Sequence, residues 1–368
     1  MLSILQSHLN PSQLIIDLMV VFMIVGAVDH LLGNRLGLGS QFLEGFAAFG
    51  SIAPTMAGIL VLVPLIGRYI APMITPLCEA AGIDSAIFAG AILACDMGGW
   101  QLACELAGSP AAAGLGGMLL GSMMGVNIVF NIPVALGIID AADRPAMSKG
   151  ILCGFLTIPV GCFFGGLTAG YEPSMLLINL LVPLGISVVI GLLLWFVPEV
   201  ITRVFLIFGR IIGILATLAA VIAIASALTG LTIIPGLGSV YDALDVVIAV
   251  VILLPGAYVM VNVISRLLKK PFAKIGGVMG VNDQSTLGLV STLANAVPTF
   301  HLIRGMDERG KVINFAFLVS AGYMLGDHLA FCSAMESALV PALLVGKATA
   351  GVTAILAALL LTRRKKSK

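Results

Sequence analysis

The chain has 368 residues, of which 60% are hydrophobic and only 10% are charged, and its net charge is +1. An ordinary soluble domain carries about 25% charged residues, so a mean hydropathy of +1.13 excludes a water-soluble globular fold. The near-zero net charge gives no basic surface for nucleic-acid binding. We therefore expect an all-α polytopic membrane protein with the lipid bilayer as its solvent.

Nine apolar segments are long enough to cross a hydrocarbon core of about 30 Å, which takes about 20 helical residues. In chain order they are residues 14–33, 44–66, 112–139, 148–170, 174–197, 203–229, 242–265, 311–334 and 338–361. Two further apolar segments, 83–107 and 283–306, carry polar or helix-breaking residues at their centres. Each of these two is either a full span or a re-entrant helical hairpin.

The positions of Lys and Arg favour the hairpins, because basic residues in short loops collect on the cytoplasmic side. With two hairpins and the N-terminus outside, Arg68 is the one basic residue left near an outer loop. Full crossing by both segments, giving eleven spans, moves residues 144–149, Arg203 and residues 266–274 outside. A ten-span topology in which only the first segment crosses misplaces Arg35 and remains an alternative.

The distribution of Lys and Arg also indicates which end of the chain faces the cytoplasm. The basic tail at residues 363–366 is expected in the cytoplasm. We therefore expect a multi-pass protein of the bacterial cytoplasmic (inner) membrane.

The order of parts repeats along the chain: a span, an Arg, a Pro, a short amphipathic piece, an interrupted segment and an interrupted span. Gly82-Ile83-Asp84 precedes the first interrupted segment and Gly280-Val281-Asn282 precedes the second, while a shift of 200 residues places Asn127 on Asp327. In the hairpin topology the copies lie on opposite sides of the membrane, which is the inverted repeat common among secondary transporters. The expected units are residues 12–170 and 203–362 of a single domain 1–368, joined by a connector helix at 174–197.

Polar residues at the centres of the two interrupted segments are candidates for a binding site, because irregular backbone at membrane depth must be buried or line a wet cavity. Asp96 lies beside Gly98 and Gly99, whose freedom at positive φ allows the chain to reverse. Asn295 lies before Pro298 in the second segment. Asp96 either offsets the charge of a bound cation or caps a helix, and Asn295 has the same two interpretations.

Asp327 and His328 follow Gly326 in an interrupted span. An ionisable group inside a span is costly unless it is paired or hydrated. These two side chains therefore either pair with each other in a structural role or bind a cation together.

Asn127 and Asn131 lie one helical turn apart on one face, just before Pro133. Their amides either accept a ligand hydroxyl or ammonium or satisfy the broken helix. Trp100 and Tyr323 flank the interrupted segments and could form a cation–π wall, although aromatic residues in membrane proteins also serve packing.

Enzyme chemistry has no support in the sequence. The six cysteines show no metal-ligand spacing, and neither a phosphate loop nor a Ser-His-Asp order is present. We expect no enzyme activity, no cofactor and no metal site.

Four motifs resemble the ethanolamine-utilisation transporter family, EutH. They are FAGAILACDMGG at 88–99, GSMMG at 121–125, RGKVIN at 309–314 and GDHL at 326–329. The resemblance extends from Asp29 to Lys347 and implies import of ethanolamine for catabolism by a lyase pathway. The enterobacterial pattern of that family has hydroxyl residues where Asn127 and Asn131 stand, so these amides are expected to tune a pocket.

Ethanolamine carries an ammonium and a hydroxyl, which the carboxylates and amides above would suit. A homodimer is a common state of carriers with a moving bundle. Two other functions remain open from the sequence. One is an ion-coupled carrier of another small polar solute, and the other is a non-transporting membrane scaffold or sensor, for which residues 266–282 and the tail are the longest exposed stretches.

Overall fold

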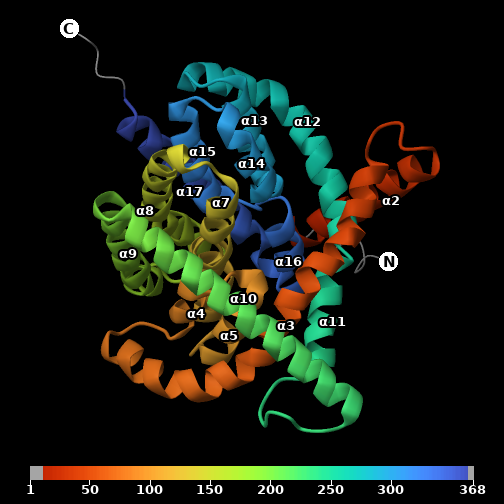
Figure 1. Ribbon diagram of the computed structural model, residues 1–368, viewed down its shortest axis with the longest axis vertical. Helices are drawn as coiled ribbons and strands as arrows, with labels where there is room; N and C mark the ends of the chain where they lie inside the picture. The colour runs from red at the N-terminus through yellow and green to blue at the C-terminus, as the bar shows by residue number, and fades with distance from the viewer. Residues whose placement is uncertain (1–10, 364–368) are drawn as a thin grey trace.

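The computed structural model describes residues 11–363, and all regular structure within that range is helical (Figure 1). The α-helices are α2 (Pro11–Leu31), α3 (Gly39–Ala80), α4 (Ala86–Ile92), α5 (Trp100–Leu106), α6 (Pro110–Ala113), α7 (Ile132–Ile138), α8 (Arg144–Thr168), α9 (Pro173–Phe196), α10 (Pro198–Thr229), α11 (Val240–Val251), α12 (Leu254–Met279), α13 (Asp283–Ala294), α14 (Ala296–Leu302), α15 (Glu308–Ala321), α16 (Asp327–Met335) and α17 (Val340–Leu361). Three π-helical segments are Cys95–Gly99, Gly114–Gly125 and Asn127–Asn131. The basic tail that we expect in the cytoplasm lies mostly outside the described residues.

Within residues 11–363, eight helical runs are long and apolar enough to cross a membrane. They correspond to eight of the nine predicted spans, and the prediction of an all-α polytopic membrane protein is confirmed. The ninth predicted span, residues 311–334, is divided between α15 and α16. The helix stops there because Gly322 adopts extended backbone angles and Tyr323 has a φ of +61°.

The first interrupted segment, residues 83–107, is a hairpin whose two ends meet. Gly108 N–H donates to the Asp84 carboxylate at 3.0 Å. Midway, Leu93 and Ala94 adopt extended backbone angles and separate α4 from Cys95–Gly99. The chain therefore returns to the level at which it began.

The second interrupted segment, residues 283–306, has the same shape. The Asn282 amide donates to Gly305 O at 2.8 Å, and extended backbone at Asn295 separates α13 from α14. Glycines at positive φ end the preceding helices in both cases, with φ +69° at Gly82 and +67° at Gly280. In Figure 1, α4 and α5 lie in the lower part of the molecule and α13 and α14 in the upper part.

The long helices α3 and α12 lead into the hairpins. α3 has 42 residues and is therefore about 63 Å long at 1.5 Å per residue, roughly twice what a hydrocarbon core requires. Its last turns, which contain Pro72 and Pro76, continue the span as the amphipathic piece expected from the sequence. Figure 1 shows the orange end of α3 crossing the lower part of the molecule and the teal end of α12 crossing the upper part.

The centre of the molecule is built from the helix at residues 110–138 together with α8, α15 and α17. In the most apolar stretch of that helix 78% of the residues are buried. In the corresponding stretch of α10 only 22% are buried, and its leucines and isoleucines point outward. Gly161 of α8 and Gly346 of α17 let their backbones approach closely, since a Cβ at Gly161 would lie 2.5 Å from Gly346 O. Small residues serve close helix contact in membranes in this way.

Candidate functional site

Asp96 lies at the tip of the first hairpin. Its Oδ1 is 3.9 Å from His328 Nε2 and has no hydrogen-bond partner among the described residues. The side chain as a whole is 26% exposed, whereas Oδ1 itself is buried. Asp96 does not cap a helix with its side chain, so the capping alternative is not what the structure shows.

The two glycines beside Asp96 differ in what they permit. Gly98 has a φ of +82°, as predicted, and a Cβ there would lie 2.5 Å from Ile59. Gly99 has a φ of −62°, so the prediction of positive φ at this residue is wrong. Glycine is required at position 99 for another reason, because a Cβ there would lie 2.6 Å from Ala94 O.

Asn295, at the tip of the second hairpin, contacts Asp327 directly. The Asn295 amide donates to one carboxylate oxygen of Asp327 at 3.0 Å, and the Tyr258 hydroxyl donates to the other at 2.9 Å. The side-chain oxygen of Asn295 also accepts from Val297 N–H at the start of α14. Pro298 lies in the first turn of α14, where proline is tolerated, so the break is made by Asn295 alone.

Asp327 and His328 contact opposite hairpins rather than each other. His328 faces Asp96, and its ring contacts that of Tyr323 in a tilted arrangement with the centroids 4.9 Å apart. Its Nδ1 lacks a hydrogen-bond partner among the described residues. Asp327 faces Asn295. The start of α16 therefore lies between the two hairpin tips and brings four of the predicted residues together.

Lys347 completes the cluster and was not among the predicted site residues. It is fully buried in α17, where its ammonium donates to Ser122 O at 2.7 Å and to Gly322 O at 2.8 Å. No ion pair joins it to Asp96 among the described residues. The sequence could have indicated Lys347 as a candidate, because a lone Lys inside an apolar span is as costly as a lone Asp.

The two carbonyls that hold Lys347 belong to irregular backbone. Ser122 lies in a π-helical segment and Gly322 at the break before α16. The two residue numbers differ by 200, which is the shift that aligned the two halves of the sequence. Lys347 therefore bridges positions that correspond in the two proposed units.

Asn127 and Asn131 share a face, as predicted, and are hydrogen-bonded within the protein. The Tyr323 hydroxyl donates to Asn131 at 2.7 Å, Asn131 donates to Asn127 at 2.8 Å, and Asn127 donates to Val319 O at 2.8 Å and to Met123 O. This chain of bonds orients the ring that His328 contacts. The amides thus contact the cluster through Tyr323.

Trp100 lies apart from Tyr323. No ring contact joins the two among the described residues, so one continuous aromatic wall is not formed. Trp100 instead lines a cavity of about 710 Å³ together with Tyr171 and Glu336. That cavity lies at the open end of the first hairpin, where Gly108 and Ser109 also line it.

Three metal-ligating side chains come together at the same place. Cys95, Asp96 and His328 place one potential ligand atom each within 4.8 Å of one another. No sequence spacing signalled this group, because His328 joins it only through the fold. The expectation of no metal site therefore stays a prediction, because these three atoms are arranged as potential ligands.

Comparison with known proteins identifies the family. The family model described as "Ethanolamine utilisation protein, EutH" matches residues 12–361. The chain belongs to the EutH family.

Curated relatives cover nearly the whole chain. A protein of Listeria monocytogenes named "Probable ethanolamine permease EutH" is 44% identical over 98% of this chain and 96% of its own length. The Escherichia coli protein of the same name is 40% identical, with 96% of each chain covered, and the Bacillus subtilis protein "Uncharacterized protein YxeR" is 39% identical, again with 96% of each chain covered. No solved structure matches this EutH-family chain.

Proposed function

We propose that this EutH-family protein is a membrane carrier, not an enzyme, that moves ethanolamine across the bacterial cytoplasmic membrane into the cell for catabolism. The observation that carries the proposal is the meeting of two hairpin tips at a buried carboxylate cluster. Relatives named as probable ethanolamine permeases support the choice of substrate. The site is the group Asp96, Asn295, Asp327 and His328, supported by Tyr323.

Asp96 is the residue that we assign to the substrate ammonium. Both oxygens of Asp327 already accept hydrogen bonds from protein donors, whereas Asp96 Oδ1 accepts none. Removing an ammonium from water costs several kcal/mol unless a carboxylate receives it. His328 Nδ1, which has no hydrogen-bond partner among the described residues, is suited to the substrate hydroxyl.

Lys347 balances Asp96 when no substrate is bound. Its ammonium is held by two main-chain carbonyls and cannot leave with the solute. The positive charge of Lys347 in the same buried region weakens the binding of a substrate ammonium at Asp96 and favours its release. A carrier needs such moderate affinity on both sides of the membrane.

Alternating access follows from the arrangement of the two units. Residues 12–170 and 203–362 form an inverted-topology repeat in this proposal, with the C-terminus cytoplasmic. Each unit contributes one hairpin, and the two hairpins enter from opposite ends of the molecule (Figure 1). Movement of one unit against the other opens the path beside one tip while the path beside the other tip closes.

Uptake of labelled ethanolamine into proteoliposomes tests the proposal. Ethanolamine should accumulate or equilibrate in vesicles that contain the protein and not in empty ones. Imposed pH, sodium and voltage gradients report the coupling. Unlabelled amino acids and nucleosides should compete poorly; if one of them competes better than ethanolamine, the carrier serves another small polar solute.

A further inference from the structure

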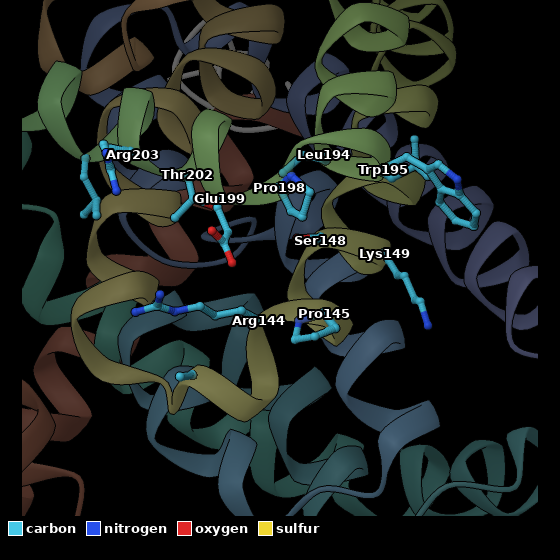
Figure 2. A pocket seen from close by; sticks show the side chains of 13 residues that line it. Arg144, Pro145, Ser148, Lys149, Leu194, Trp195, Pro198, Glu199, Thr202 and Arg203 are labelled. Carbon is cyan, nitrogen blue, oxygen red and sulfur yellow. The ribbon is translucent and has the colours of Figure 1, made fainter.

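A cavity of about 710 Å³ lies between the start of α8 and the junction of α9 with α10. It is separate from the hairpin tips and shares no residue with the substrate site. Figure 2 shows Arg144 and Lys149 on one wall, Glu199, Thr202 and Arg203 on the other, and Trp195 at one edge.

The basic side chains around this cavity have no protein partners. Among the described residues, Arg144, Lys149 and Arg203 form neither an ion pair nor a side-chain hydrogen bond, and the same holds for Glu199. Two cations from elsewhere in the chain are neutralised by acidic residues just before α8. Arg304 pairs with Asp140 at 2.6 Å, and Lys311 pairs with Asp143 at 2.7 Å. The cavity therefore keeps an excess of positive charge.

Helix starts and two hydroxyls also line the same cavity. α8 begins at Arg144 and α10 begins at Pro198, so the first turns of both helices line it. The dipole of a helix start favours an anion, although Pro145 and Pro198 have no N–H and the N–H groups of Arg144 and Val200 already donate within the protein. The hydroxyls of Ser148 and Thr202 lie one turn into each helix.

One edge of the cavity continues into apolar surface. Trp195 is 54% exposed and Leu206 is 40% exposed, and both line the cavity. Beyond them α9 and α10 present leucines and valines outward, including Leu192 and Val189. A ligand seated here has its polar end among cations and an apolar wall beside it, which is the environment of a lipid at the membrane surface.

We infer that this cavity binds the phosphate headgroup of an anionic phospholipid, with the acyl chains lying along α9 and α10. Three cations against one carboxylate favour a net negative headgroup over a zwitterionic one. The bound lipid holds the start of α8 to the α9–α10 junction. This inference is independent of what the protein carries.

Native mass spectrometry of the full-length protein tests the inference, with phosphatidylglycerol, phosphatidylethanolamine and free glycerol phosphate as probes. Phosphatidylglycerol should remain bound, and the double variant Arg144→Gln/Arg203→Gln should weaken it about thirtyfold, at about fivefold per removed charge. The matched control Lys269→Gln/Lys270→Gln removes two charges from exposed positions outside the cavity and should change binding less than twofold.

A gain of affinity keeps the test decisive if the double variant fails to fold. Glu199→Gln removes the single carboxylate and should tighten phosphatidylglycerol about fivefold. Equal binding of phosphatidylethanolamine, equal binding of free glycerol phosphate, or unchanged affinity in both cavity variants would overturn the inference.

Discussion

Lys347 and Asp96 carry opposite charges in the interior of the proposed site, without a direct ion pair between them among the described residues. Lys347→Met leaves Asp96 without its countercharge and leaves Ser122 O and Gly322 O without a donor. A buried carbonyl that loses its donor costs about 1–3 kcal/mol, so we expect a clear fall in the thermal unfolding temperature of the purified protein.

The double variant Asp96→Asn/Lys347→Met separates the pair from other effects of Lys347. Removing both charges should recover part of the stability lost in Lys347→Met, as a double-mutant cycle would measure. Strictly additive losses in that cycle would contradict an interaction between the two charges.

The sequence indicates a candidate site residue where a polar side chain lies beside a helix break. Asp96, Asn295, Asp327 and His328 could be predicted because each is a polar residue beside a helix break. Tyr258 could not, since a tyrosine in a span is equally consistent with packing, and its bond to Asp327 exists only in the fold.

At the scale of elements, the sharp reversal at the first hairpin tip depends on Gly98. Gly98→Ala forces a side chain into a φ of +82° and against Ile59 at 2.5 Å. Such strain costs about 1–3 kcal/mol, and displacement of the tip should lower ethanolamine uptake as well.

A matched glycine provides the control for that variant. Gly137 of α7 has open space where a Cβ would lie, and Gly137→Ala should leave uptake and the unfolding temperature nearly unchanged. Equal losses in the two variants would show that the tip has no special role.

Helix breaks were easier to predict than their exact form. The sequence placed interruptions near Asp96, Asn295 and Gly326, and the structure has one at each. Pro298 lies in the first turn of α14, where a proline lacks only an N–H that would have no partner there. The π-helical form of Gly114–Gly125 has no sequence signal that we can name.

At the scale of the whole molecule, the proposed topology places the open ends of the two hairpins on opposite sides of the membrane. Ser109→Cys at the open end of the first hairpin should react with a membrane-impermeant maleimide added outside intact cells. Asp283→Cys at the open end of the second hairpin should react only after the cells are permeabilised. Both residues are exposed, and the Cys104→Ser background removes an exposed native thiol.

The ten-span and eleven-span topologies give a different labelling pattern. In either one, Asp84→Cys and Ser109→Cys would be labelled from opposite sides, because the first segment would cross. The bond between Gly108 and Asp84 already holds those two ends together. Hydropathy and charge could predict the apolar helices, but only the fold shows that the ends of each hairpin meet.

Uptake of labelled ethanolamine by proteoliposomes containing Asp96→Asn is the most direct test of the proposed site. Asn keeps the size of the side chain and removes the charge that receives the ammonium, so uptake should fall at least about a hundredfold, as expected for loss of a buried charge partner. Asp245→Asn, at an exposed carboxylate of α11, should transport like the unmodified protein. Uptake by Asp96→Asn at the level of Asp245→Asn, with both proteins correctly inserted, would contradict the account.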